Sequence, residues 1–319
     1  MEYEIHEDIV IVGAGIAGLS SLYSSRTSQI GNSESGSGII RRSQRVRIVG
    51  FALTMWTNAW RAADALGIGD SLRATSFRLQ GIKFCYRNPS LRSQQQAHSA
   101  DHKFDKSESR CVRRKDLLET LERELPQGTI RYSSRIVSIE ESGRLKLLHL
   151  ADGTVVRTKV LIGCDGANSM VAKWLGLQSP VNDRRSAIRG FVDYMDGHGF
   201  ELKLHTYISG DVRYGFMPCD HKSIYWFCSF AQSLFKSCDA LHPMTPDIGQ
   251  GGCSSLEDSI ILARCLGEAL LAKRTCNDKG KDEDYVMIEK GLEKYSRERR
   301  WRSFSLISKS ICCWPDTRE

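Results

Sequence analysis

The chain has 319 residues, enough for one large domain or two, and 41% hydrophobic with 26% charged residues is ordinary for a globular protein. The formal net charge of +7 is scattered, which argues against a nucleic-acid-binding protein, and the basic run at residues 297–302 (RERRWR) is interpreted as a solvated helix face. Without a run of about 18 apolar residues, no membrane-spanning helix is predicted.

The cysteines and the first residues bear on the compartment. Eleven cysteines without CxxC pairs or regular spacing predict neither a metal site nor a disulfide framework, and they favour a reducing compartment. The acidic residues among positions 2–8 are unlike a transit peptide. We therefore expect a cytoplasmic protein.

The first predicted elements surround residues 8–19, DIVIVGAGIAGL. Residues 9–12 predict a buried parallel strand, and a helix is predicted from Ile16. Gly13, Gly15 and Gly18 lie between them at GxGxxG spacing, which suits a tight turn, backbone contact with a pyrophosphate and close helix packing. The helix N-terminus would face the phosphates. This pattern predicts an adenine-dinucleotide site, with a glycine-rich turn without ligand as the alternative.

Residues 23–47 interrupt the expected dinucleotide fold. That fold needs a second strand ending in an acidic residue about 20 residues after the glycines, to bind a ribose hydroxyl. Residues 23–47 are rich in serine and glycine and predict loop or disorder, and Glu34 stands at the right count without a strand before it. The second strand is therefore predicted to be missing.

The next elements alternate between helix and strand. Residues 59–72 predict one helix with Trp60, Ala63 and Leu66 on its buried face, and Trp56 and Trp60 are interpreted as core residues. A strand is expected at 79–86, an exposed excursion at 87–106 and an amphipathic helix at 116–125. The basic residues at 113–115 suit a phosphate or simply a charged helix start.

The remaining segments predict more strands and two helices. Strands are expected at 130–132, 136–140, 145–150, 155–160 and 160–164, and the last runs into Asp165–Gly166 and a helix at 168–175. Residues 186–230 predict an antiparallel sheet. A Pro- and Gly-rich stretch at 239–258 leads into a helix to residue 272, and a last helix is expected at 285–301. His242 is interpreted as structural, and no catalytic side chain is nominated.

Three separated segments together resemble one family: GAGIAG at 13–18, GCDGANS at 163–169 and DALHPMTPDIGQGGC at 239–253. The chain resembles the FAD-dependent aromatic hydroxylases, and looks most like their plant zeaxanthin-epoxidase-like and salicylate-hydroxylase-like monooxygenases. The resemblance implies an α/β fold with two domains. A Rossmann-like FAD-binding domain with a parallel sheet would comprise residues 1–80, 104–180 and 238–319. A smaller, mainly antiparallel substrate domain would comprise 81–103 and 181–237.

The resemblance also implies cofactor-binding residues. The pyrophosphate of FAD would lie on the glycine loop, formed by Gly13, Gly15, Ile16, Ala17 and Gly18. Arg114 would be a basic contact, Asp165 and Gly166 would serve FAD and transient NAD(P)H, and Asp239 would bind the ribityl chain. The flavin would be lined by Pro246, Gly249, Gly251 and Gly252.

The implied reaction uses FAD as cofactor and NADPH or NADH as co-substrate. Dioxygen would form a flavin hydroperoxide that hydroxylates or epoxidises an aromatic or isoprenoid-like small molecule. Two alternatives stay open: a catalytically impaired, truncated FAD-binding remnant, and a flavin-dependent dehydrogenase. Family analogy also leaves a plastid location open, and the sequence does not determine the oligomeric state.

The chain departs from the family pattern at three places. The ribose-binding acid would fall near Arg41, a basic residue. The junction between Phe230 and Cys238 is several dozen residues shorter than in the family, with Cys238 where glycine is usual, and the chain ends soon after Trp301. We interpret these differences as internal deletions that affect the cofactor domain.

Overall fold

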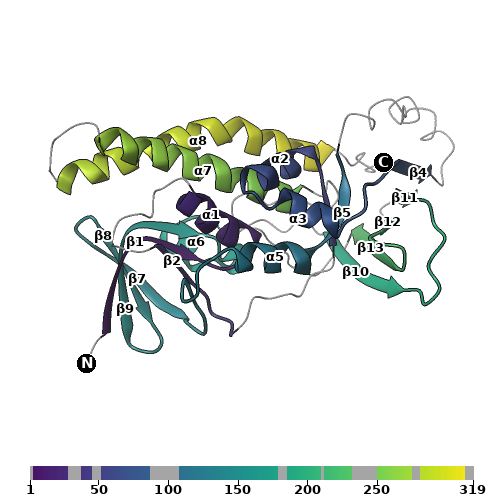
Figure 1. Ribbon diagram of the computed structural model, residues 1–319. Helices are drawn as coiled ribbons and strands as arrows, with labels where there is room; N and C mark the ends of the chain where they lie inside the picture. Colours follow the sequence, from purple (N-terminus) through teal and green to yellow (C-terminus); the bar gives the residue numbers. More distant parts are fainter. Residues whose placement is uncertain are drawn as a thin grey trace.

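A computed structural model describes residues 3–27, 37–44, 52–86, 108–178, 185–209, 212–231, 250–274 and 281–312. Within these ranges the chain forms a six-stranded sheet and a five-stranded sheet, with helices packed beside them (Figure 1). No helix in this part of the chain is long and apolar enough to cross a membrane.

The six-stranded sheet is mixed. Its order is β6 (Ile130–Arg131), β2 (Ser37–Ile40), β1 (Tyr3–Val12), β9 (Thr154–Gly163), β8 (Leu145–Leu150) and β7 (Ile136–Ser142). The first four strands are parallel, and β7, β8 and β9 form an antiparallel meander. The α/β prediction is confirmed, but the two strands expected at 155–160 and 160–164 are one continuous strand, β9.

Strand β1 separates two apolar cores. Ile9 and Ile11 pack among the helices, whereas Val10 and Val12 pack with residues of β7, β8 and β9. This alternation follows from the two-residue repeat of a strand. All four side chains are at most 6% exposed, so the strand that carries the glycine loop is buried on both faces.

Helix α1 (Ile16–Thr27) packs on the six-stranded sheet, α5 (Arg114–Arg123) and α7 (Gly251–Arg274) pack beside α1, and α8 (Lys281–Cys312) packs on α7. Helix α8 runs alongside α7 (Figure 1). Where α1 crosses α7, the buried hydroxyls of Ser20 and Ser259 are hydrogen-bonded at 2.6 Å. Both C-terminal helices extend beyond their predicted limits, because packing on the core stabilises helical turns that sequence pattern alone leaves marginal.

The single helix predicted at 59–72 is wrong, because the chain forms α2 (Thr57–Ala65) and α3 (Gly69–Ala74) instead. Gly67 has φ +72°, and the N–H of Ile68 donates to the carbonyl of Ala63 at 3.0 Å. This is a glycine C-cap, which ends a helix in the left-handed conformation that glycine tolerates. Trp60 is only 1% exposed, so its placement in the core is confirmed.

The prediction that the second strand is missing is also wrong. Residues Ser37–Ile40 form β2, which pairs in parallel with β1 through Ile39 opposite Ile11 and Ile40 opposite Val12. Only Ile39 and Ile40 of this strand have large apolar side chains, so the composition did not indicate a strand. Strand β2 lies between β1 and β6 and pairs with both, and its two isoleucines are buried, at 0% and 4% exposed. Pairing and burial together stabilise the strand. Glu34 and the rest of residues 28–36 lie outside the described residues.

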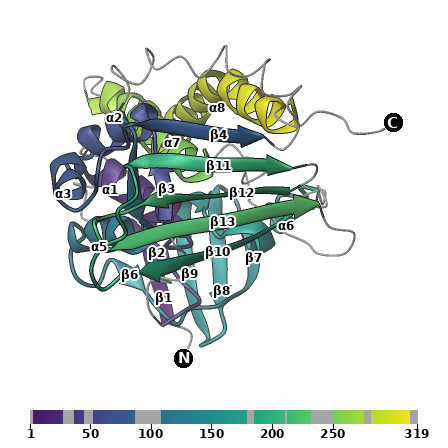
Figure 2. The same cartoon turned by 90° about the vertical axis from the view of Figure 1, so that its right-hand side faces the viewer.

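The five-stranded sheet has the order β10 (Arg185–Asp193), β13 (Ser223–Ala231), β12 (Val212–Pro218), β11 (Lys203–Ser209) and β4 (Gly81–Tyr86). Figure 2 looks onto this sheet. The antiparallel sheet predicted at 186–230 is confirmed, and β4 joins its edge in parallel to β11. One face packs Leu204, Met217 and Tyr225 against Cys111. Cys111 belongs to a ribbon of β3 (Ala52–Met55) and β5 (Arg110–Arg113).

Candidate functional site

The glycine loop between β1 and α1 is shaped by close packing. A Cβ on Gly13, whose φ is +105°, would lie 2.3 Å from the carbonyl oxygen of Cys164, and a Cβ on Gly18 would lie 1.8 Å from that of Gly13. A Cβ on Gly15 would meet nothing within 4 Å. Gly13 and Gly18 are therefore required by the protein's own packing, whereas Gly15 leaves space in front of the loop.

The first turn of α1 faces this space. Its first main-chain bond within the helix runs from the N–H of Leu19 to the carbonyl of Gly15 at 3.0 Å. The N–H groups of Ile16, Ala17 and Gly18 precede this bond, and helix geometry provides them no partner inside the helix. Their partial positive charge beside an open glycine suits an anionic group. The loop therefore fits the pyrophosphate of a dinucleotide.

The structure brings the Asp165–Gly166 motif directly behind the glycine loop. Strand β9 runs parallel to β1, and the N–H of Cys164 donates to the carbonyl of Val12 at 2.8 Å. The carboxylate of Asp165 accepts bonds from the Ser169 hydroxyl and the Met170 N–H, both at 2.6 Å. These bonds hold the turn before α6 (Met170–Trp174). Asp165 thus orders the turn that backs Gly13.

The glycines that begin α7 lie beside the same loop. A Cβ on Gly252 would lie 3.0 Å from Cδ1 of Leu53 in β3 and 3.4 Å from Cδ1 of Ile16 in α1. Gly251 is the first residue of the helix. Two of the residues predicted from the third motif are therefore close to the first motif. Asp239, Pro246 and Gly249, together with His242, lie outside the described residues.

Arg41 lies against the glycine loop, and its charge acts on Arg114, the first residue of α5. We call the glycine loop, the Asp165–Gly166 turn and the start of α7 the cradle. Arg41 follows β2, is 8% exposed, and donates from Nη1 to the carbonyl of Ala14 at 2.6 Å. Burial and the charge of Arg41 lower the pKa of Arg114. The sequence indicated that Arg41 occupies the place of an acid, but it did not predict the side-chain contact with the glycine loop. This contact depends on strand β2, which the composition of residues 23–47 did not indicate.

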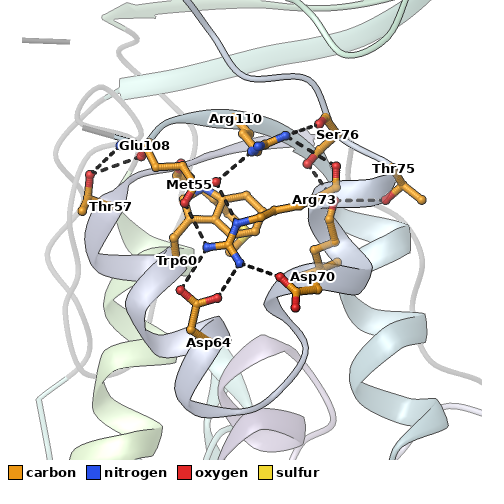
Figure 3. A network of polar contacts seen from close by, with 11 residues as sticks. Met55, Thr57, Trp60, Asp64, Asp70, Arg73, Thr75, Ser76, Glu108 and Arg110 are labelled. Carbon is orange, nitrogen blue, oxygen red and sulfur yellow. Dashed lines mark hydrogen bonds and ion pairs between the residues drawn. The ribbon is translucent and has the colours of Figure 1, made fainter. Parts of the chain in front are cut away.

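A network of polar contacts, drawn in Figure 3, holds the start of β5, the strand that precedes Arg114. Arg73 of α3 forms ion pairs with Asp64 at 2.6 Å and with Glu108 at 2.9 Å, and Arg110 reaches Glu108 at 2.9 Å. The guanidinium of Arg73 also lies 4.9 Å above the ring of Trp60. Because Arg110 begins β5, this network fixes the strand that leads into Arg114.

The opposite charges in this network stabilise each other, as the pKa shifts of Arg73 and Glu108 indicate. Hydrogen bonds to Asp64 and Glu108 raise the pKa of Arg73, and the hydrogen bond from Arg73 lowers the pKa of Glu108 despite its partial burial. The main chain of Glu108 also pairs with the Thr57 hydroxyl in both directions, at 3.1 and 3.2 Å. The cluster holds α2, α3 and β5 together, and we interpret it as structural.

The interpretation of residues 297–302 as a solvated face is wrong for two arginines. Arg299 is 9% exposed and pairs with Glu257 at 3.0 Å and with Asp258 at 2.5 Å. Arg302 pairs with Glu257 at 2.9 Å. Both carboxylates lie in the first turns of α7, so these arginines connect α8 to the helix that begins at the cradle.

Comparison with known proteins gives a consistent result. The chain matches the FAD binding domain family over residues 6–237. It is 40% identical to Monooxygenase 2 of Arabidopsis thaliana over 97% of this chain and 89% of that protein, and 31% identical to Monooxygenase 1 of the same plant over 93% and 87%. The first alignment runs over 372 positions, more than the 319 residues here. Monooxygenase 2 therefore contains residues without a counterpart in this chain.

Solved structures share the fold at low sequence identity. Klebsiella pneumoniae HpxO complexed with FAD and uric acid has a TM-score of 0.71 at 17% identity, covering 95% of this chain and 87% of that one. Pseudomonas aeruginosa PqsL in complex with 2-aminobenzoylacetate has a TM-score of 0.70 at 17% identity, covering 96% and 95%. The six-stranded and five-stranded sheets therefore belong to a known architecture.

Proposed function

The chain belongs to the FAD binding domain family of FAD-dependent monooxygenases, and on that premise we propose that NADH or NADPH is its reductant and a small aromatic molecule its substrate. The observation that carries the proposal is that the first two motifs and the end of the third meet at one glycine turn, with Gly13 against Cys164 and Gly252 against Ile16. The flavin supplies the oxidation chemistry, and its reduced form activates dioxygen. The protein's part is binding, orientation and exclusion of water.

The residues of the cradle have distinct proposed roles. The open face of Gly15 and the first N–H groups of α1 would hold the pyrophosphate, and Arg114 would add positive charge beside it. The turn at Asp165 and Gly166 would present main-chain groups to the cofactor, because each oxygen of the carboxylate already accepts a bond within the turn. Gly251 and Gly252, at the start of α7, would line the flavin.

The proposed substrate surface is one face of the five-stranded sheet. Strand register puts Phe191 opposite Tyr225 and Arg189 opposite Phe227, so these four side chains share a face. The rings of Phe191 and Tyr225 are 5.9 Å apart and those of Tyr225 and Phe227 are 6.2 Å apart. Tyr225 is part of the core at 6% exposed, whereas Phe191 and Phe227 are partly buried. An aromatic face suits an aromatic substrate.

The two sheets support the proposed division into domains. Strand β4 pairs with β11 although more than one hundred residues separate them in sequence. Residues 81–103 and 181–237 would form the substrate domain on this basis, and residues 1–80, 104–180 and 238–319 the FAD domain.

The solved neighbours HpxO and PqsL were crystallised with the small molecules uric acid and 2-aminobenzoylacetate.

The first experiment measures FAD binding by thermal unfolding of the full chain. FAD at a hundred times its Kd should add about 2.7 kcal/mol to the free energy of unfolding. Gly15→Asp should fold normally, because a Cβ there meets nothing within 4 Å, but should lose this stabilisation because its carboxylate faces the pyrophosphate. Gly81→Asp is the matched control, since Gly81 also has open space but lies in β4. A colourless protein without FAD stabilisation would contradict the proposal.

The second experiment tests the reaction. Bound flavin should be reduced by NADH or NADPH without oxygen, and readmission of dioxygen with candidate aromatic acids should place one oxygen atom in the product, measured by mass spectrometry with labelled dioxygen. Flavin that stays reduced when dioxygen is readmitted, and is reoxidised only by an added electron acceptor, would indicate a dehydrogenase. Flavin that binds but is never reduced would indicate a non-catalytic remnant.

A further inference from the structure

The five-stranded sheet carries apolar side chains on both of its faces. Its inner face packs Leu204, Met217 and Tyr225 against Cys111. Because side chains alternate along a strand, the residues between these positions point to the other side. Strand register places the following side chains together on that side, which we call the outer face: Ile188, Val192, Tyr207, Tyr214, Phe216 and Trp226. An antiparallel sheet normally has polar residues on a face that is open to water, so this composition predicts that a partner covers the outer face.

The aromatic rings of the outer face are packed on the sheet. The rings of Tyr207 and Tyr214 are stacked, with centroids 4.9 Å apart and planes 7° apart. The indole of Trp226 lies over Gly190, where a Cβ would come within 2.7 Å of the ring. Side chains that are already ordered lose little conformational freedom when a partner binds. The outer face is therefore a preformed surface.

The outer face is open to solvent. Ile188 is 55% exposed, Tyr214 is 46% exposed and Val192 is 42% exposed. Figure 2 views the sheet from this side, and no helix of the described residues lies in front of it. Five strands of six to nine residues, spaced about 4.8 Å apart with a rise of about 3.3 Å per residue, cover about 600 Å². A largely apolar face of this size is at the upper limit for a monomeric protein and marks a contact site.

The edge of the outer face carries both signs of charge. Phe200, in the connection from β10 to β11, packs its ring on that of Phe216 with centroids 5.0 Å apart. The same connection exposes Asp196 and Glu201, and Glu201 pairs with Lys203 at 3.3 Å. Nucleic acids and anionic membranes are negatively charged and repel these carboxylates. An apolar centre with a polar edge of mixed charge is instead the usual composition of a protein–protein interface.

A second copy of this chain fits the size and the chemistry of the outer face. Two twisted sheets pack face to face about 10 Å apart, with their apolar side chains interdigitating. Two outer faces of about 600 Å² each would bury on the order of 1,200 Å² in total, which is the lower end of the range for specific, stable interfaces. In a two-fold dimer the same patch contacts itself, so one apolar face supplies both sides of the interface.

We propose that the outer face is the interface of a homodimer, in which the five-stranded sheets of two copies of this chain pack face to face. Because β12 is the middle strand of the five, Tyr214 lies near the centre of this interface, where aromatic residues contribute most to binding. The proposed substrate surface is on the inner face, so the dimer leaves it open. The inference goes beyond the proposed function and does not depend on FAD binding.

The test measures the mass of the full chain in solution by sedimentation equilibrium, with and without added FAD. We expect twice the 35.9 kDa of one chain at micromolar concentration. Tyr214→Glu should weaken self-association at least about a hundredfold, because each copy would place a carboxylate without a partner in the apolar centre. Ile188→Lys should weaken it by about tenfold, because Ile188 lies in the edge strand β10 and its charge stays closer to solvent.

Val137→Glu is the matched control, since Val137 is 59% exposed but lies in β7 of the six-stranded sheet. This variant should keep the mass of a dimer. Thermal unfolding checks that each variant folds, and Ile188→Lys keeps the test decisive if Tyr214→Glu does not.

Two results would overturn the proposal. The first is an unmodified chain that sediments as a monomer at every concentration measured, and cosedimentation of that monomer with neutral phosphatidylcholine vesicles would assign the outer face to a lipid surface instead. The second is a dimer whose mass is unchanged by substitution at Tyr214 and at Ile188, because its interface then lies elsewhere.

Discussion

Two pairs of arginines in this molecule lie close together and have opposite electrostatic surroundings. Arg73 and Arg110 share the carboxylate of Glu108, and Arg73 also pairs with Asp64, so the pKa of Arg73 is raised. At the cradle, Arg41 contacts a neutral carbonyl and helps to lower the pKa of Arg114. Carboxylates thus stabilise the charge of Arg73, whereas burial and a neighbouring positive charge disfavour the charged form of Arg114.

The difference indicates what each pair is for. Arginines whose charge is matched by carboxylates contribute to folding, because removing either side leaves an uncompensated charge. Perturbed pKa values gather at functional sites, and Arg41, whose charge lowers the pKa of Arg114, lies against the glycine loop. The network of Figure 3 is thus expected to govern stability, and the Arg41–Arg114 pair is expected to govern binding.

The largest expected effect is at Arg73. Arg73→Ala removes ion pairs with Asp64, Asp70 and Glu108 as well as the contact with Trp60, and should lower the free energy of unfolding by about 2–3 kcal/mol, measured by urea denaturation. The side chain of Arg73 is 25% exposed, which keeps the expected loss below that of a fully buried pair. Arg61→Ala, at an exposed position of α2, is the control and should change stability by less than about 0.5 kcal/mol. If Arg73→Ala and Arg61→Ala lowered the free energy of unfolding equally, the ion pairs of Arg73 would not stabilise the fold, and the contrast with the Arg41–Arg114 pair would be lost.

A smaller effect is expected when Glu108 is neutralised. Glu108→Gln should cost about 1 kcal/mol at pH 7, because charge-assisted bonds from Arg73 and Arg110 become neutral ones. The pKa of Glu108 is lowered in the folded protein. The carboxylate therefore contributes fully to the free energy of unfolding above its unfolded pKa of about 4.3, and this contribution is lost as the pH falls through the folded pKa. The difference in the free energy of unfolding between Glu108→Gln and the unmodified protein should therefore shrink as the pH falls below about 5, measured by urea unfolding at each pH.

The control for this pH series is Glu289→Gln, at an exposed position on α8. It should leave the dependence of stability on pH unchanged. A constant difference between Glu108→Gln and the unmodified protein at every pH would show that the carboxylate charge is not what stabilises the network.

The smallest change in stability is expected at Arg114. Arg114→Gln should change the free energy of unfolding by less than about 1 kcal/mol, because burial and the charge of Arg41 already disfavour the charged form of Arg114. The same variant should weaken FAD binding by about tenfold, through loss of a charge-assisted contact. Urea denaturation and fluorescence titration measure the two quantities. A loss of stability similar to that of Arg73→Ala would place Arg114 among the structural arginines.

Local sequence pattern predicted the parts of the molecule whose geometry is local. Gly13, Gly15 and Gly18 follow an apolar strand at a spacing that allows one backbone path, and β1 and α1 have the predicted types. The strand before Asp165 and the antiparallel sheet from β10 to β13 were also predicted. Their signals, alternating apolar residues and turn residues, lie within a few positions of each other in the sequence. These motifs were also sufficient to predict the family.

Tertiary structure decided the features that depend on distant partners. Strand β2 has two apolar residues and exists because β1 and β6 hold it, which is a long-range effect that composition does not contain. The inward turn of Arg299 needed the carboxylates of α7 forty residues away in the same way. Arg41 is a single basic residue in sequence, but with β2 in place its guanidinium lies against Ala14. The sequence alone determined that there is a glycine cradle, and only the packed structure decided which charge stands beside it.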